Sequence, residues 1–251
     1  MEQIRGSMAA VAAHRGWHAD GAEKNSIAGL ERAVRGGVDS IENDIRRLGD
    51  GTIIVHHDAT LAGVPLEQLD RSVLAHHPHI PTLDQWAKRA GELGATGLIE
   101  FKDGGYEREA MATLRRHMPD SRLQLMSFHA DVVAKLRELA PEGPVGLLSR
   151  DPATSADELV RNARAAGASF LGLNISQASE PVLRAADGAG LGVAVWTVDR
   201  SEDIARLLAD RRVNTVITDA PRLALDLRGA LHGATQSSLG VRLLRAATLA
   251  R

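Results

Sequence analysis

The chain alternates short β-type runs with helical stretches over most of its length, and this alternation restricts the fold more than any other feature. Eight runs of apolar, β-branched or alanine-rich residues are each followed by a stretch of helical character. Repeated strand–helix units require parallel strands joined by right-handed crossovers. The predicted strands are Val11–His14, Ser40–Arg46, Gly97–Lys102, Leu123–Phe128, Val145–Ser149, Phe170–Asn174, Gly192–Val198 and Thr215–Asp219.

The number of units decides between the two common parallel architectures. Eight units in about 220 residues match a (β/α)8 TIM barrel of the α/β class better than an open doubly wound sheet. We expect one domain over residues 1–251, with the barrel core at about 11–221. A tail over 232–251 carries a short apolar helix pattern that would pack beneath the barrel or join subunits. The intervening helices are predicted at about residues 25–35, 82–93, 108–117, 130–140, 155–166, 179–189 and 201–210.

A second strand signal directly follows the predicted strand over 40–46. Asp50-Gly51 lies between two β-branched runs, which predicts a β-hairpin with a two-residue loop. Paired residue numbers in such a hairpin sum to about 101, so Asp44 would face His57. Glu42 lies two residues away on the same strand face. Two carboxylates and an imidazole on one patch indicate a functional site.

Composition excludes several classes of protein. The formal charge of −2 argues against a broad nucleic-acid surface, which needs a basic excess. The absence of cysteine excludes disulfides, thiolate metal sites and cysteine nucleophiles. The longest apolar runs are far short of a membrane span, and residues 8–13 are too few for a signal-peptide core. We therefore expect a cytoplasmic protein with a small-molecule partner; the sequence does not indicate an oligomeric state.

Polar residues collect where a barrel would place its site. Active sites in this fold lie at the C-terminal ends of the strands. The residues that end the predicted strands include His14, Arg15, Glu42, Asp44, Glu100, Lys102, Ser127, Phe128, Asn174 and Trp196.

An ordered set of motifs resembles the glycerophosphodiester phosphodiesterase family, within the phosphodiesterases related to phosphatidylinositol-specific phospholipase C. The resemblance spans about residues 11–221. Each motif alone is a weak signal, but the ordered set is specific. The motifs are His14-Arg15-Gly16, Asn25-Ser26, Glu42-x-Asp44, Asp50-Gly51, His57-Asp58-x-Thr60-Leu61, Pro81-Thr82-Leu83, Glu100-x-Lys102, Ser127-Phe128, Val195-Trp196-Thr197-Val198 and Thr218-Asp219.

The resemblance implies a role for each candidate residue. His14 and His57 would form a general acid/base pair, because cleavage of a phosphodiester removes one proton and delivers another. Three hard oxygen ligands suit Mg²⁺ or Ca²⁺ better than zinc, with Mn²⁺ as a further candidate. The expected metal ligands are Glu42, Asp44 and Glu100, and the expected substrate- and phosphate-binding residues are Arg15, Lys102 and Trp196.

Simpler interpretations exist for single residues. Glu100 and Lys102 could form only an ion pair at the barrel mouth, and Trp196 could be a packing residue. His18 and His56 are predicted to be unconnected with the site, because His56 should point to the opposite sheet face from His57.

The sequence also departs from the resembling family in two places. Lys24 stands where the family usually has an acid, and only residues 62–80 separate Leu61 from Pro81, where relatives specific for glycerol carry a larger insertion. An open site would admit bulkier or lipid-like substrates.

Three functions follow in order of preference. The first is a metal-dependent phosphodiesterase that hydrolyses glycerophosphodiesters to glycerol phosphate and an alcohol. The second is a phospholipase D-like lyase that forms a cyclic phosphate from a lysophospholipid-type substrate. The third is a barrel that binds phosphorylated ligands without catalysis.

Overall fold

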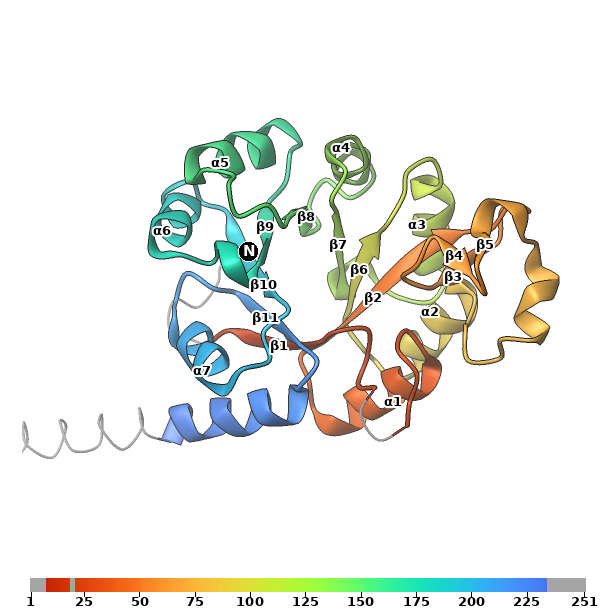
Figure 1. The fold of residues 1–251 in the computed structure, drawn as a ribbon, viewed down its shortest axis with the longest axis horizontal. Coiled ribbons are helices and arrows are strands. Elements are labelled where there is room, and N and C mark those ends of the chain that lie inside the picture. Colours follow the sequence, from red (N-terminus) through yellow and green to blue (C-terminus); the bar gives the residue numbers. More distant parts are fainter. Residues whose placement is uncertain (1–7, 19–20, 234–251) are drawn as a thin grey trace, which may run out of the picture.

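The computed structural model of the protein describes residues 8–18 and 21–233. They form a closed ring of eight parallel strands surrounded by helices, which confirms the predicted TIM barrel (Figure 1). The ring runs β1-β11-β10-β9-β8-β7-β6-β2 and closes where β1 pairs with β2. The ring strands are β1 (Ala10–Ala13), β2 (Ser40–Arg47), β6 (Gly97–Phe101), β7 (Leu123–Ser127), β8 (Val145–Ser149), β9 (Phe170–Asn174), β10 (Gly192–Trp196) and β11 (Thr215–Thr218).

A helix follows each ring strand on the outside of the barrel. After β11, residues 221–233 are helical; most of the predicted tail, from residue 234 onward, lies outside the described residues. The predicted helix at about 82–93 is present as α2 (Leu83–Glu92), and Thr82 is its N-cap, since the Thr82 side chain accepts a hydrogen bond from the Gln85 amide in a capping box. The other helices are α1 (Ile27–Gly36), α3 (Glu107–Arg115), α4 (Ala130–Leu139), α5 (Ala156–Ala165), α6 (Glu180–Gly188) and α7 (Ser201–Ala209).

Alternation along the strands builds two apolar layers. Inward-facing side chains fill the barrel interior, while outward-facing ones pack against the helices. Each ring strand except β2 contributes to the interior cluster; β2 instead directs Glu42 and Asp44 inward. The interior cluster consists of Ala12, Leu98, Met126, Leu148, Phe170, Ala194 and Ile217.

The segment between β2 and α2 forms a small lobe beside the barrel. It holds β3 (Ile53–Val55), β4 (Thr60–Leu61), β5 (Val64–Pro65) and the 3-10 turns η1 (Leu66–Gln68) and η2 (Arg71–Ala75). A separate apolar cluster fills the lobe, formed by Leu48, Ile54, Leu61, Leu66 and Ile80. Two further 3-10 turns connect elements elsewhere in the described residues, η3 (Asp120–Arg122) and η4 (Ile175–Gln177).

The predicted hairpin is present, but its predicted register is wrong by one residue. Arg46 pairs with Ile54, and the Leu48 amide donates to the Thr52 carbonyl, so the loop has three residues. Gly51 takes the left-handed conformation with φ +90°, typical of a three-residue loop built on a type I turn. Asp44 therefore lies opposite His56, whose amide donates to its carbonyl at 2.9 Å. Asp-Gly alone did not show that Gly49 also belongs to the loop.

Candidate active site

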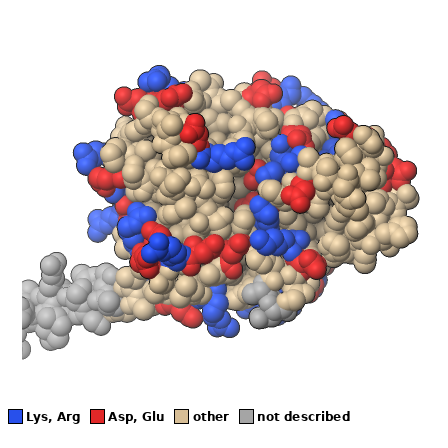
Figure 2. Space-filling view, viewed as in Figure 1, with Lys and Arg blue, Asp and Glu red and all other residues tan. Residues whose placement is uncertain are grey.

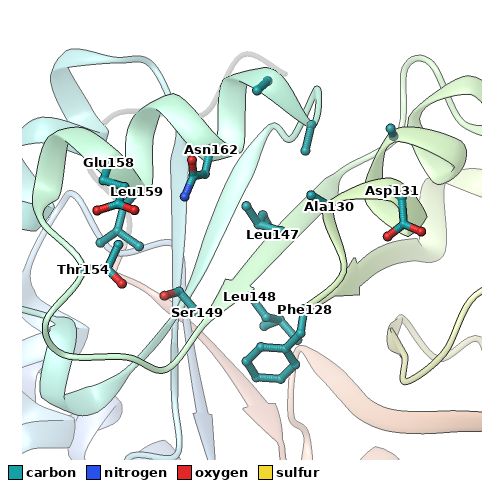
Figure 3. Close-up of a pocket in the computed structure, with 13 residues that line it drawn as sticks. Phe128, Ala130, Asp131, Leu147, Leu148, Ser149, Thr154, Glu158, Leu159 and Asn162 are labelled. Carbon is teal, nitrogen blue, oxygen red and sulfur yellow. The ribbon is translucent and has the colours of Figure 1, made fainter.

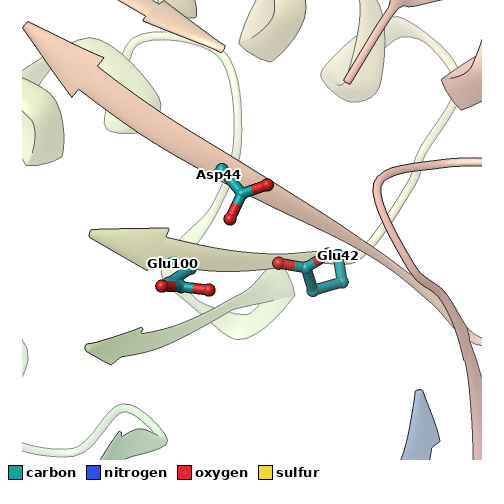
Figure 4. Close-up of side chains that lie close together, drawn as sticks. All are labelled: Glu42, Asp44 and Glu100. Carbon is teal, nitrogen blue, oxygen red and sulfur yellow. The ribbon is translucent and has the colours of Figure 1, made fainter. Parts of the chain in front are cut away.

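Three buried carboxylates meet inside the mouth of the barrel. β2 supplies Glu42 and Asp44, and the parallel register places Glu100 of β6 directly beside Asp44. Figure 4 shows the three side chains directed toward one another from the two strands. One oxygen of each lies within 4.8 Å of the others, and the three residues are at most 7 % exposed. Like charges this close are unfavourable without a cation, so the donor set fits a hard divalent ion.

The pKa values of the three acids reflect this crowding. Burial, and then the charges of Asp44 and Glu100, raise the pKa of Glu42 well above its usual value. Burial and Asp44 raise the pKa of Glu100 to about 7. Burial also opposes ionisation of Asp44, but Lys102 and Arg15 outweigh it and lower the pKa of that carboxyl. The ion-free cluster thus holds protons that a divalent ion would displace.

Two cations border the carboxylates, Lys102 and Arg15, the residues predicted to bind phosphate. Lys102 Nζ lies 2.6 Å from Glu100 Oε1 and 3.4 Å from Asp44 Oδ1. Arg15 Nε lies 3.2 Å from Asp44 Oδ2, and the Arg15 amide donates to Glu42 Oε2 at 2.9 Å. The simple ion pair between Glu100 and Lys102 therefore exists, and it forms part of a larger network rather than standing alone.

A strained loop after β1 positions this network. Arg15 and Asn25 both have positive φ, 55° and 60°, a conformation that costs non-glycine residues about 1–3 kcal/mol. The Asn25 amide donates to the Arg15 carbonyl at 2.8 Å, which joins the two residues. The Asn25 side chain donates to Asp44 Oδ2 and accepts from the Asp44 amide. Asn25 thus orients Asp44, a role that its place in the Asn25-Ser26 motif did not reveal.

His14 is held by a carboxylate from the other end of the chain. Its Nδ1 lies 2.7 Å from Asp219 Oδ1, and its Nε2 lies 3.9 Å from Glu42 Oε2. Asp219 follows β11, which pairs with β1, so 205 residues of sequence separate two neighbours in space. Burial disfavours the charged carboxyl, but hydrogen bonds from His14 and His18 outweigh it and lower the pKa of Asp219.

The prediction that His18 is unconnected with the site is wrong. His18 Nε2 lies 3.0 Å from the same Asp219 oxygen that contacts His14. Lys24, the residue that departs from the resembling family, places Nζ 3.6 Å from Asp219 Oδ2. No local pattern in the sequence indicates this cluster, because it depends on barrel closure.

His57 has a carboxylate partner of its own. Its Nδ1 lies 2.7 Å from Oδ1 of the adjacent Asp58, and its ring is half-buried. Burial lowers the pKa of His57, although the bond to Asp58 acts in the opposite direction. His57 and His14 both line the cavity above the carboxylates. The structure therefore brings the two histidines to one site despite the shifted hairpin register.

The cavity is small and has two chemically different sides. Its volume is about 90 Å³. β1, β2 and β6 supply the charged side described above. The other side consists of Met126, Phe128, Leu148, Arg150, Trp196 and Ile217. Phe128 and Trp196 pack edge to face with ring centroids 5.5 Å apart, and Trp196 Nε1 donates to the Gly172 carbonyl. Trp196 thus both packs and lines the site.

A larger groove adjoins the cavity on the outside of the barrel. It has a volume of about 510 Å³ and lies over β8 between α4 and α5 (Figure 3). Phe128 and Leu148 border both the groove and the cavity. The last paired residues of β7 and β8 are Ser127 and Leu147. Phe128 and Leu148 directly follow them, where the two strands separate.

Two further observations concern the helices and the surface charge. Among the described residues, no helix is both long and apolar enough to span a membrane. On the face drawn in Figure 2, Lys and Arg side chains are interspersed with Asp and Glu. The expectations of a cytoplasmic location and of no nucleic-acid partner stay predictions.

Comparisons with solved structures give the class of protein first. A glycerophosphodiester phosphodiesterase from Parabacteroides distasonis superposes with a TM-score of 0.79 at 25 % identity, covering 90 % of this chain and 100 % of that one. A phosphodiesterase from Oleispira antarctica, solved with the product sn-glycerol-3-phosphate, shares the fold with a TM-score of 0.75 at 21 % identity, covering 88 % of this chain and 96 % of that one. The protein is a phosphoric diester hydrolase built on a TIM barrel.

Sequence comparisons narrow the class. The profile of the glycerophosphoryl diester phosphodiesterase family matches residues 14–223. A glycerophosphodiester phosphodiesterase from Caldanaerobacter subterraneus is 25 % identical over 239 residues, covering 86 % of this chain and 96 % of that protein. This chain belongs to the glycerophosphoryl diester phosphodiesterase family.

Proposed function

We propose that the protein hydrolyses glycerophosphodiesters to glycerol phosphate and an alcohol, with a divalent ion and two histidines as acid and base. The observation that carries the proposal is the placement of His14 and His57. Each has a carboxylate on Nδ1, at 2.7 Å in both cases, and both line one cavity above three buried acids. The product bound to the Oleispira relative agrees with glycerol phosphate as product.

The residues present fit a divalent cation. Glu42, Asp44 and Glu100 would hold it, and their buried oxygens are the ligands that Mg²⁺, Ca²⁺ and Mn²⁺ accept. Such an ion neutralises phosphate oxygens and favours ionisation of a bound hydroxyl. Arg15 and Lys102 would bind the remaining phosphate charge, Arg15 as a planar fork and Lys102 as a point charge.

The histidines supply the proton transfers. A carboxylate oxygen can only accept a hydrogen bond. In the neutral form of each ring, Nδ1 therefore carries the proton, and Nε2 has a lone pair that can accept one. One Nε2 would take a proton from the attacking water as the new P–O bond forms. The other ring, protonated, would give its proton to the alcohol oxygen as the old P–O bond breaks. Two fixed rings on one cavity suit this exchange.

The first experiment tests the reaction itself. Glycerophosphodiesters, a lysophospholipid and an aryl phosphodiester are assayed with Mg²⁺, Mn²⁺ or Ca²⁺, each with and without chelator. We expect ion-dependent release of glycerol phosphate. Absence of turnover on every diester with every ion would instead support the barrel that binds phosphorylated ligands without catalysis.

The second experiment separates acid from base. His14→Ala and His57→Ala should each lower turnover of an alkyl diester by about two to four powers of ten. An aryl leaving group needs no proton, so the variant lacking the acid should recover on that substrate while the other should not. Equal losses on both substrates would show that the histidines only position the phosphate.

A second candidate is the lyase that forms a cyclic phosphate from a lysophospholipid-type substrate. The observation in its favour is the groove between α4 and α5, which shares Phe128 and Leu148 with the cavity and could hold an apolar chain. Phosphorus NMR of the reaction distinguishes the two. A persistent cyclic phosphate supports the lyase, and a phosphomonoester as the first product supports hydrolysis.

A further inference from the structure

Arg150 is a charged residue at the site to which neither the fold nor the proposed reaction gives a role. It directly follows β8, which is the fourth strand from β1 around the ring and so stands across the barrel from His14 and Arg15. Its exposed side chain lines the cavity. Its guanidinium lies over Phe128, with Cζ 5.4 Å from the ring centroid.

Arg150 differs from the other two cations of the cavity in its partners. Arg15 and Lys102 are each within ion-pair distance of a buried carboxylate. In the part of the chain that the structure describes, Arg150 has no carboxylate within that distance. Its charge is therefore available to a ligand, and the ring of Phe128 holds it at the mouth.

The aromatic pair beside Arg150 does not suit a cationic ligand. Phe128 and Trp196 together would be an attractive site for a quaternary ammonium group. However, Lys102 Nζ also lies 5.8 Å from the Phe128 centroid, so this ring already has two cations around it. A third positive charge would be repelled by both. An anionic group would be attracted by both.

We propose that Arg150 determines specificity by binding an anionic group on the alcohol portion of the substrate, beyond the scissile phosphate. The preferred substrates are glycerophosphodiesters whose alcohol carries a carboxylate or a second phosphate, and cationic alcohols are disfavoured. This inference rests on the proposed function, since it refers to the same cavity and the same substrate class.

A matched pair of substrates tests the inference. Serine differs from ethanolamine by one carboxylate, so the measured quantity is the ratio of kcat/KM for glycerophosphoserine to that for glycerophosphoethanolamine. We expect a ratio above one that falls about tenfold in Arg150→Gln, as for the loss of one charge-assisted hydrogen bond at an exposed site. Arg150→Glu should invert the preference, and Arg150→Lys should retain part of it. Arg161→Gln, an exposed change on α5, is the control and should leave the ratio unchanged.

A binding measurement keeps this test independent of catalysis. Calorimetry with O-phosphoserine and O-phosphoethanolamine compares the same two groups without turnover. Tighter binding of phosphoserine that depends on Arg150 supports the specificity even if no diester is hydrolysed, in which case the proposed function alone fails. Equal loss on both ligands in Arg150→Gln would show that Arg150 binds the phosphate common to them. That result, or no preference in either assay, overturns the inference.

Discussion

At the scale of single residues, the site depends on groups that fix the reactive side chains. Asn25 holds Asp44, Asp219 holds His14, and Asp58 holds His57. Each partner restricts the orientation of a side chain that would contact substrate or ion. Such supporting hydrogen bonds often matter to activity nearly as much as the groups they orient.

Asp219→Asn tests the support of His14. An amide can donate as well as accept, so it no longer requires a proton on His14 Nδ1, and the ring can turn or change tautomer. We expect kcat to fall by about two to four powers of ten with little change in KM, as for a disturbed acid/base group. Asp187→Asn, an exposed change on α6, should have no effect. A large rise in KM with kcat unchanged would mean that Asp219 contacts substrate.

Glu100→Gln tests the crowding of the acids through pH. In the ion-free protein the pKa of Glu100 is about 7, above its ordinary value of 4.5. The folded state thus keeps a proton that the unfolded chain releases, and stability falls as pH rises between these values. The side chain of Gln in the variant is neutral at every pH in this range. We expect the variant to match the parent near pH 5 and to exceed it by about 1–3 kcal/mol near pH 8 in chelator.

Urea unfolding at the two pH values measures the difference. A loss of stability at both would contradict the prediction, and would mean that the ion pair between Glu100 and Lys102 outweighs the repulsion by Asp44.

At the scale of elements, most of the barrel could be predicted from the sequence because its signals are local. Apolar runs, a Thr82 cap and glycines after helices locate strands and helices without knowledge of the fold. The same alternation placed Glu42, Asp44 and Glu100 at one mouth. The hairpin register could not be predicted, because whether the loop holds two or three residues depends on contacts of Gly49 with the lobe.

The contacts of His14 and His18 with Asp219 could not be predicted from the sequence for a different reason. It arises only when β1 meets β11 on closure of the ring, and no local pattern records which side chains then face each other. His18 lies in a loop without periodicity. A single histidine in an irregular loop does not by itself indicate a functional site.

Gly49→Ala tests how the lobe holds the hairpin. The Gly49 amide donates to the carbonyls of Leu66 and Leu69, and an added Cβ would lie 2.1 Å from the Glu67 carbonyl oxygen. The hairpin and η1 would have to separate. We expect a loss of about 1–3 kcal/mol in unfolding free energy, the usual cost of overpacking. Gly188→Ala, where an added Cβ meets nothing within 4 Å, is the control. Equal stability of both variants would show that the hairpin and η1 can separate without a measurable loss of unfolding free energy.

At the scale of the whole molecule, the barrel keeps a repulsive site stable by surrounding it with apolar layers. The interior cluster lies below the acids, and the larger cluster outside the strands joins the ring to its helices. Two features at the mouth reduce the stability of the fold. One is the backbone strain at Arg15 and Asn25, and the other is the burial of three acids. A ligand that relieves the repulsion should therefore stabilise the entire fold.

This coupling gives a prediction for ion binding. Ions that bind only the folded state raise its stability, by about 2.7 kcal/mol at a concentration of 100 times Kd. Protons on Glu42 and Glu100 compete with the ion, because burial raises both pKa values. Mg²⁺, Mn²⁺ or Ca²⁺ should therefore raise Tm strongly near pH 8 and weakly near pH 5, and ion binding should release protons.

Thermal unfolding at the two pH values, with and without ion, measures the effect, and Asp44→Asn supplies the contrast. Removing this ligand should abolish the rise in Tm while leaving the ion-free barrel folded, because the apolar layers do not depend on it. An equal rise at both pH values, or a rise that persists in Asp44→Asn, would place the ion away from the carboxylates. The stabilisation would then come from general binding to surface carboxylates, which added salt weakens by screening more than it weakens binding at a buried site.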